Sequence, residues 1–343
     1  MGQAEFLREK ALELGFADMG IVRLEALRGL SERLAERSRK VPFRDDAYGN
    51  FGHFVAPRER RPWAQALIVV AIYLGRYRIP PRADGYIGKL YLTDFYGYPP
   101  SPDYQRIAAY GEFLAKEGIR AESDPFRGLT ALRYAAQAAG LGLIRQNNFF
   151  YGAKGSFYRL EAWAIDRELE LRGSGGATAR PCPANCLKCV QNCPSRSLSE
   201  PFTMNMGTCV SYLSSVGPIL ALSSRLLKDM GGWLYGCDAC QDRCPFNKGQ
   251  WEGVEEFPLL EEVAAKALPG SLLEMSYAEI QKTLSPKFSY IVPELIFRWK
   301  LNALNVIDNL ALTQYLPQTR MARADSHPLV REKAAAVARR LAK

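Results

Sequence analysis

Cys182-Pro-Ala-Asn-Cys186-Leu-Lys-Cys189-Val-Gln-Asn-Cys193-Pro194 is the stretch that decides how this chain folds. A second stretch completes it: Cys209, followed by Cys237-Asp-Ala-Cys240-Gln-Asp-Arg-Cys244-Pro245. Together the two stretches hold all eight cysteines of the 343-residue chain. One metal-binding module therefore accounts for every thiol.

The spacing predicts two [4Fe–4S] clusters. Such a cluster needs four thiolates, and in the two-cluster ferredoxin pattern the cysteine that precedes proline ligates the other cluster. The first cluster would be held by Cys182, Cys186, Cys189 and Cys244. The second would be held by Cys193, Cys209, Cys237 and Cys240. Cys182 and Cys186 are separated by three residues instead of the common two, which a loop can absorb.

Zinc and disulfides are the alternatives. Two Cys-x-x-Cys pairs can form a zinc site, but zinc explains neither the two Cys-Pro endings nor the eighth cysteine. Disulfides require an oxidising compartment, and the opening residues read as an amphipathic helix without an export signal. We therefore expect a cytoplasmic protein. No apolar run approaches 18 residues, so we expect no membrane span.

The net charge of +9 and the pI near 9.1 are compatible with a nucleic-acid partner. Basic side chains with interleaved tyrosines gather in one segment, and this mixture suits stacking plus phosphate contact. The segment contains Arg58, Arg60, Arg61, Arg76, Arg78, Arg82 and Lys89, with Tyr73, Tyr77 and Tyr86. The ordinary alternative is that these charges are only a solvated face.

Three regions are predicted along the chain. Residues 1–175 alternate helical and strand patterns and read as an α/β domain, in a chain of α+β/α/β class overall. Its expected helices lie near 3–14, 25–40, 103–116 and 129–139, and its strands near 19–24, 65–74 and 156–165. The Gly-rich stretch 172–180 leads to a ferredoxin-like double-cluster module, 176–250, with an apolar helix-like insertion over 218–227. Residues 251–343 read as helical, ending in a HEAT-like hairpin of helices over 299–312 and 328–341.

The run from Gly207 to Leu213 and the run from Tyr235 to Asn247 closely resemble those of epoxyqueuosine reductases. Weaker likenesses extend over most of the chain, at Leu67–Tyr73, Asp103-Tyr104-Gln105, the Gly-Leu-Gly turn 140–142, Gly155-Ser156, Leu301–Ala303, Asp308-Asn309 and His327–Glu332. The resemblance implies a cytosolic reductase that uses cobalamin and two [4Fe–4S] clusters on the epoxide of a modified guanosine in tRNA. Reductive dehalogenases share this cofactor plan.

The resemblance also implies roles for particular residues. Corrinoid contacts would fall to Gly140, Gly142, Asn147, Gly155 and Ser156. The family's Gly-Lys-Asn is Arg145-Gln146-Asn147 here, and an alignment shifted by two residues makes Asp124 the counterpart of the proton-donating aspartate. The alternative for Asp124 is an ordinary turn residue before Pro125. His53 and His327 read as a structural or exposed residue and a helix cap, so we expect no histidine ligand to cobalt.

These observations predict an iron–sulfur, cobalamin-dependent reductase resembling epoxyqueuosine reductase. Its partners would be tRNA and a low-potential electron donor of flavodoxin or ferredoxin type. The alternative is a divergent reductase or electron-transfer protein on the same scaffold, acting on another small molecule or on a partner's corrinoid. A third hypothesis is a non-catalytic electron carrier or RNA-binding module.

Overall fold

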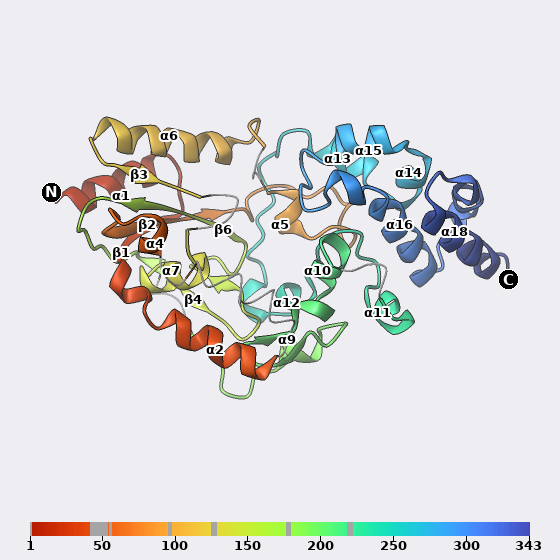
Figure 1. The fold of residues 1–343 in the computed structure, drawn as a ribbon, viewed down its shortest axis with the longest axis horizontal. Coiled ribbons are helices and arrows are strands. Elements are labelled where there is room, and N and C mark those ends of the chain that lie inside the picture. The colour runs from red at the N-terminus through yellow and green to blue at the C-terminus, as the bar shows by residue number, and fades with distance from the viewer. Residues whose placement is uncertain are drawn as a thin grey trace.

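The computed structural model describes residues 2–41, 54, 57–94, 98–124, 129–175, 180–217 and 222–343. The chain forms an elongated molecule with its two termini at opposite ends of the long axis (Figure 1). The N-terminal sheet lies at one end, the cysteine-rich module in the middle and a stack of helices at the other end (Figure 1). No helix among the described residues is long and apolar enough to cross a membrane.

A four-stranded sheet of order β1-β2-β6-β3 organises the N-terminal part. Its strands are β1 (Asp18–Arg23), β2 (Ala66–Tyr73), β6 (Tyr158–Ile165) and β3 (Ala121–Glu122). β2 is buried along its whole length because it lies between two partners and both faces of the sheet are covered. Its register runs from Ala66 opposite Ile165 to Tyr73 opposite Tyr158.

All pairings in this sheet are antiparallel. The α/β label predicted for residues 1–175 was therefore too narrow, and the fold is mixed α+β. Alternating helix and strand patterns do not specify whether neighbouring strands are parallel or antiparallel. That depends on whether the connection between two strands ends at the same edge of the sheet or crosses to the opposite edge.

Helices cover both faces of the sheet (Figure 1). α1 (Gln3–Glu13) and α6 (Pro102–Lys116) pack on the face that includes Ile68 and Val70. α7 (Leu132–Ala138) covers the face that includes Leu67 and Val69. The turn η1 (Leu24–Leu27), α2 (Leu30–Lys40), α4 (Pro57–Arg60), α5 (Lys89–Leu92) and the hairpin β4 (Leu143–Ile144) with β5 (Phe150–Tyr151) complete this part.

Short elements make up the cysteine-rich module, as expected where metal ligands rather than a large core set the chain path. They are α9 (Lys188–Gln191), the hairpin β7 (Leu198–Glu200) with β8 (Thr203–Met204), η3 (Met206–Thr208), α10 (Val210–Ser215), α11 (Ser224–Asp229), α12 (Ala239–Asp242) and η5 (Pro245–Asn247). Residues 218–221 of the predicted apolar insertion lie outside the described residues, and α11 begins at Ser224.

The C-terminal region is helical, as predicted. It contains α13 (Leu260–Lys266), α14 (Pro269–Glu274), α15 (Tyr277–Thr283), η6 (Pro293–Leu295), α16 (Arg298–Asn309), η7 (Thr313–Tyr315), α17 (Leu316–Met321), η8 (Ala322–Ala324) and α18 (Pro328–Leu341). α16 and α18 are the two helices predicted to pair, and they pack against each other. His327 is the N-cap residue of α18, and its ring stacks on Phe297 at 3.7 Å between centroids.

One polar face of α16 holds the cysteine-rich module in place. The Asn302 amide donates to the carbonyls of Ser214 and Leu234, each at 2.8 Å. Further along the helix, the amides of Asn305 and Asn309 both donate to the Leu227 carbonyl at 2.8 Å. These side chains satisfy carbonyls at the ends of α10 and α11, which the short helices leave without partners.

Candidate functional site

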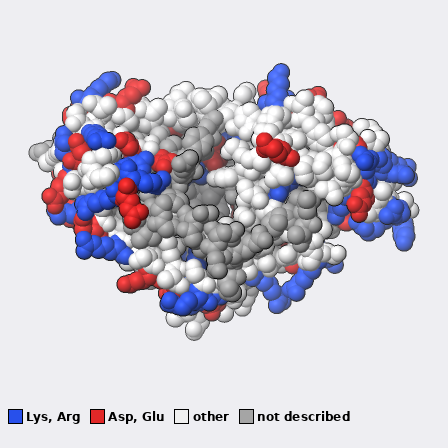
Figure 2. All heavy atoms as spheres, in the orientation of Figure 1, with Lys and Arg blue, Asp and Glu red and all other residues white. Residues whose placement is uncertain are grey.

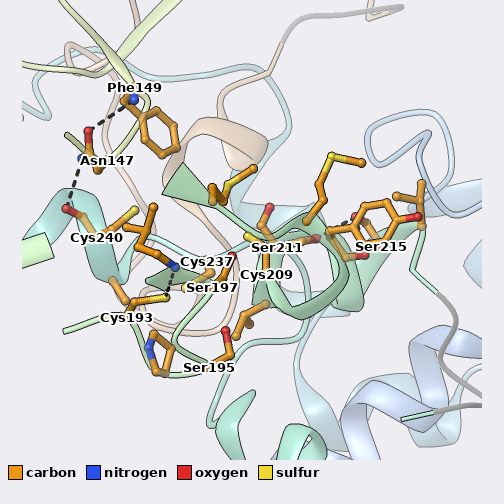
Figure 3. A pocket seen from close by; sticks show the side chains of 18 of the residues that line it. Asn147, Phe149, Cys193, Ser195, Ser197, Cys209, Ser211, Ser215, Cys237 and Cys240 are labelled. Atoms are coloured by element: carbon orange, nitrogen blue, oxygen red, sulfur yellow. Dashed lines mark hydrogen bonds between the residues drawn. The ribbon is translucent and has the colours of Figure 1, made fainter. Parts of the chain in front are cut away.

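The eight cysteines line two cavities, four in each. A cavity of about 140 Å³ is lined by Cys182, Cys186, Cys189 and Cys244. A second cavity, of about 500 Å³, is lined by Cys193, Cys209, Cys237 and Cys240. Figure 3 shows the second cavity, with these four side chains grouped on one side of it. Residues up to 62 positions apart in the sequence thus meet in one place (182 to 244).

Local backbone donors surround the cysteine sulfurs. The amide of Leu198 donates to Cys193 Sγ at 3.4 Å. Cys209 is the N-cap residue of α10, so free backbone N–H groups of the first turn follow it. Donors of this kind stabilise the negative charge of a thiolate cluster and influence its reduction potential.

Burial raises the pKa of Cys189 to about 11, and it also raises the pKa of Cys209, Cys237 and Cys240. Thiols in such surroundings keep their protons unless a metal replaces them.

Asn147 lies between the two cavities and lines both. Its amide nitrogen donates to Tyr151 Oη at 2.9 Å and to the Cys240 carbonyl at 3.3 Å, and its Oδ1 accepts from the Phe149 amide at 3.2 Å. These bonds fix the hairpin β4–β5 of the N-terminal part against the loop that carries Cys240 (Figure 3).

Arg145 places a guanidinium in the smaller cavity. Only 4% of the residue is exposed, and Nη1 lies 3.9 Å from Cys182 Sγ. Its guanidinium carbon is 3.4 Å from the Phe246 ring centroid and 4.9 Å from that of Tyr151. A buried positive charge beside a cluster ligand favours the more negative, reduced state of a cluster.

A hollow in the N-terminal part continues from the larger cavity. Its volume is about 500 Å³, and it shares Arg133, Phe149, Met204 and Met206 with the larger cavity. Its other walls include Phe150 of β5, Tyr158 and Leu160 of β6, and Leu132 at the start of α7. Such a largely apolar space beside the second set of cysteines has the size of an ordinary ligand-binding pocket.

The glycines predicted to contact a corrinoid lie against protein. A side chain at Gly140 would meet the backbone of Gly173, and one at Gly142 would meet the carbonyl of Tyr151. Gly155 has φ of +73°, and a Cβ there would lie 2.5 Å from Asn247 Oδ1. None of these three lines a cavity described above, so their small size is used for close packing of segments.

Ser156 lines the hollow and also joins the two parts of the chain. Its amide donates to Asn247 Oδ1 at 2.8 Å, and the Asn247 amide donates to Ser156 Oγ at 2.9 Å. Ser156 Oγ and Gln241 Oε1 are 3.2 Å apart. The Gly155-Ser156 step is therefore a docking point for the loop that carries Cys244.

Asp124 directly follows β3 and pairs with arginines of the N-terminal part. Its Oδ2 is 3.3 Å from Arg60 Nη1 and 3.9 Å from Arg61 Nη2. It does not line any of the cavities described above, so its role as proton donor stays a prediction. His53 lies outside the described residues.

The Arg- and Tyr-rich segment is occupied by internal ion pairs. Each of its seven basic side chains lies within 4.0 Å of a carboxylate, the partners being Glu25, Asp124, Glu122, Asp103, Glu256, Glu261 and Asp242 in chain order. Tyr73 and Tyr77 are buried. Several of these ion pairs are solvent-exposed, among them Arg78 with Glu256 and Arg82 with Glu261, so the RNA surface that the composition suggested stays a prediction.

Sequence reasoning missed most of the residues that line the larger cavity and the hollow. Tyr91 and Tyr290 reach the larger cavity from α5 and from the segment before η6, which are 199 positions apart (91 to 290). Met204 and Met206 come from the hairpin between the two cysteine stretches. No local pattern marks these residues, because only the fold brings them together. Arg145 was visible as a departure from the family pattern.

Comparison with known proteins supports the iron–sulfur assignment. The family described as "4Fe-4S double cluster binding domain" matches residues 182–247, a range that contains all eight cysteines. Two [4Fe–4S] clusters are therefore the cofactors of this module, and the zinc and disulfide alternatives fall away.

The chain is similar to epoxyqueuosine reductases over almost its whole length. It is 32% identical over 114 residues to the enzyme of Prochlorococcus marinus (strain NATL2A), a match that spans 33% of this chain and 35% of that protein. It is 25% identical to the enzyme of Bacillus subtilis (strain 168), across 96% of this chain and 86% of that protein.

A crystal structure of epoxyqueuosine reductase with an epoxyqueuosine-modified stem loop of tRNA-Tyr has the same fold. Its TM-score is 0.75 at 22% sequence identity, and the match covers 99% of this chain and 90% of that chain. The shared double-cluster module, the match along the chain and the common fold together make this chain similar to epoxyqueuosine reductases from end to end.

Proposed function

We propose that this protein reduces the epoxide of epoxyqueuosine in tRNA with electrons carried by two [4Fe–4S] clusters. The observation that carries the proposal is the division of eight cysteines between two cavities, one of which continues into a hollow of the N-terminal part. Cys182, Cys186, Cys189 and Cys244 would ligate the first cluster. Cys193, Cys209, Cys237 and Cys240 would ligate the second.

The reaction requires two electrons and two protons, because the epoxide oxygen leaves as water and a double bond remains. Each cluster passes one electron at a time, so the pair can deliver both electrons in sequence. Asn147 separates the two cavities and would hold the clusters at a fixed spacing. The cytoplasm, where thiols and low-potential carriers stay reduced, is the compartment that we propose.

We infer that a cobalamin would bind in the hollow. Its walls offer apolar side chains for a flat macrocycle, with Arg133 and Arg159 at its border for polar edge groups. The residues that would hold the cofactor are Phe149, Leu160 and Met204, and Ser156 would reach its edge. When bound, cobalamin supplies a strongly reducing metal centre at the substrate, and the chain positions that substrate and excludes water.

Basic side chains at the C-terminal end support contact with tRNA. Figure 2 shows Lys and Arg gathered over the end of the molecule that α18 forms. Lys228, Arg339 and Lys343 are exposed there, on α11 or at the end of α18. Phosphate contacts of this kind predict that tRNA affinity falls with increasing salt.

Anaerobic reconstitution tests the proposal. The purified chain, loaded with iron, sulfide and cobalamin, should bind about eight iron atoms, as two [4Fe–4S] clusters require. With a chemical reductant it should convert epoxyqueuosine in a tRNA stem loop to queuosine, measured by mass spectrometry of the nucleosides. A fully loaded protein that leaves the epoxide unchanged would contradict the proposed substrate.

A second candidate is a reductase on the same scaffold that acts on another small molecule or on a partner's corrinoid. The ion pair of Asp124 with Arg60 favours it, because the residue matched to the family's acid does not line the hollow. Turnover of the epoxide by the unaltered protein separates the two candidates. Asp124→Asn then tests the acid: loss of epoxide turnover with full cluster content supports the proton-donor role. Unchanged turnover assigns the proton to another group.

A further inference from the structure

The surface around the first cluster carries basic side chains that no carboxylate neutralises among the described residues. Arg180, Lys188, Arg243 and Lys248 are all exposed, and we call them the basic rim. Arg180 lies two residues before Cys182, and Lys188 lines the smaller cavity. Arg243 precedes Cys244, and Lys248 follows η5. The rim therefore surrounds the ligands of one cluster only.

The acidic side chains of the same stretch do not offset the rim. Residues 180–250 contain four carboxylates, and each lies within 4.0 Å of a basic side chain outside the rim. Glu200 pairs with Lys40, Asp229 with Arg225, and Asp238 and Asp242 with Lys89. Asp238 and Asp242 share the single amine of Lys89. Residues 180–250 still carry seven basic side chains against four carboxylates, a net charge of +3, and a partner of opposite charge would be attracted to this part of the surface.

The first cluster is also the one that lies near the surface. Pro181, Pro183, Ala184, Asn185 and Leu187 are exposed, and they surround Cys182 and Cys186 in the loop. The second cluster instead faces the hollow, because its cavity shares four wall residues with that space. The cavity of the first cluster shares none of the lining residues of the hollow. One cluster thus faces the surface and the other the reaction space.

We propose that the basic rim is the docking site of a small acidic one-electron carrier protein, and that electrons enter this chain at the first cluster. Leu187, 40% exposed within the rim, provides a central apolar contact. A small apolar contact surrounded by charges is typical of weak, transient complexes between redox proteins. In such complexes, opposite charges on the two proteins increase the association rate. Each encounter transfers one electron from the reduced carrier to the oxidised cluster, and no bond forms or breaks.

RNA is the competing polyanion for this surface. The rim lacks the exposed aromatic side chains that stack on single-stranded bases, and its apolar residue is an aliphatic leucine. It also surrounds the cluster that lies away from the hollow, whereas the reacting nucleoside must reach the hollow. Both observations favour a protein carrier over RNA.

The test measures how fast the clusters are reduced, and it requires only that the protein holds its clusters. The loaded full-length protein is mixed with a reduced, acidic [2Fe–2S] ferredoxin in a stopped-flow instrument, and bleaching of the [4Fe–4S] absorption gives the rate. For the unaltered protein, the second-order rate should fall as salt rises. Lys188→Glu combined with Arg243→Glu should lower the rate at low salt about tenfold and remove most of the salt dependence.

The matched control is Lys116→Glu combined with Lys282→Glu, because both side chains are exposed on α6 and α15 and the net charge changes equally. This control should keep the rate of the unaltered protein. Reduction by the small molecule methyl viologen should not slow in either double variant.

Three results would overturn the proposal. The first is a rate of reduction by ferredoxin that does not depend on salt, and the second is an equal rate in the rim and control variants. The third is a rim variant that loses affinity for a tRNA stem loop while its rate of reduction by ferredoxin is unchanged. The proposal rests on the proposed function only through the presence of the clusters. A chain that binds no iron contradicts the proposed function. If methyl viologen bleaches the clusters normally and the rim variant is reduced by ferredoxin as fast as the unaltered protein, only the docking site is contradicted.

Discussion

Arg145 occupies a position where its single charge can shift the reduction potential of the first cluster. Its guanidinium is buried 3.9 Å from Cys182 Sγ and is held in place by the rings of Phe246 and Tyr151. Because electron uptake makes a cluster more negative, a nearby positive charge stabilises the reduced state and raises its reduction potential.

We therefore expect Arg145→Met to lower the reduction potential of the first cluster by an amount on the order of 50–100 mV. An EPR-monitored redox titration of the loaded protein measures the shift. Arg145→Lys, which keeps the charge, should shift the potential much less, and the signal of the second cluster should stay in place. Equal shifts in both variants would show that packing, and not charge, is responsible.

Glu161 is a buried carboxyl on β6, and it lies outside the chemistry proposed above. Only 4% of it is exposed, and burial raises its pKa from 4.5 to about 7. Below about pH 4.5 the carboxyl is protonated in both the folded and unfolded states. Between that pH and about 7 only the unfolded state releases the proton, so the free energy of unfolding falls as pH rises.

Glu161→Gln should remove this pH-dependent decrease in the free energy of unfolding. Between pH 4.5 and 7 the variant should gain stability relative to the unaltered protein, reaching about 3 kcal/mol above pH 7. Urea unfolding of both proteins across this range measures the difference. A difference that stays constant with pH would mean that Glu161 titrates normally in the fold.

At the scale of elements, close contacts between turns join the N-terminal part to the cysteine-rich module. The turn at Gly155 packs on η5, where a Cβ would lie 2.5 Å from Asn247 Oδ1. Gly118, at the end of α6, has a similar φ of +67°, and a Cβ there meets nothing within 4 Å. The two glycines therefore share backbone strain and differ in packing.

This pair allows a matched test. Gly118→Ala should cost about 1 kcal/mol, the usual cost of a side chain in the left-handed region. Gly155→Ala should cost at least about 2 kcal/mol more, because it also displaces the Asn247 amide from Ser156. Thermal unfolding measures both, and iron content should fall only in Gly155→Ala. Equal losses of stability would show that the docking contact contributes little.

At the scale of the whole molecule, the core does not stop at the predicted boundary of residue 250. One cluster of buried side chains runs from Leu7 and Ile68 in the N-terminal part, through Ile87 and Leu234, to the C-terminal helices. The ring of Tyr235 stacks on Trp299 at 5.3 Å between centroids, two residues before Cys237. The C-terminal helices thus support the second cluster directly.

A chain that ends at residue 250 should therefore fail to fold cooperatively, since the apolar surfaces of Ile87, Leu234 and Tyr235 would meet water. Limited proteolysis and near-UV circular dichroism measure the effect. A chain that lacks only residues 342 and 343, which are exposed, is the control and should keep its stability. A stable 1–250 fragment with both clusters would establish an independent boundary there.

The sequence by itself determined the chemistry of the metal module. Cysteine spacing and the two Cys-Pro endings were enough to divide eight ligands into the two sets that line two cavities, because short loops leave few ways to surround a cluster. An apolar run also located β2 and an alternating run located β6, each within one or two residues, since a strand covered on both faces is mostly apolar and a half-covered one alternates.

Only the tertiary structure decided the direction of the strands, the residues that line the hollow, and which charged side chains form ion pairs. Antiparallel pairing follows from how connections return across the sheet, and no local pattern records this. The seven basic side chains that suggested an RNA surface are neutralised by carboxylates up to 179 positions away (82 to 261). The basic rim, whose residues looked no different in the sequence, is left with its charge beside the first cluster. Charge pairing depends on distance in space, and the fold alone sets that distance.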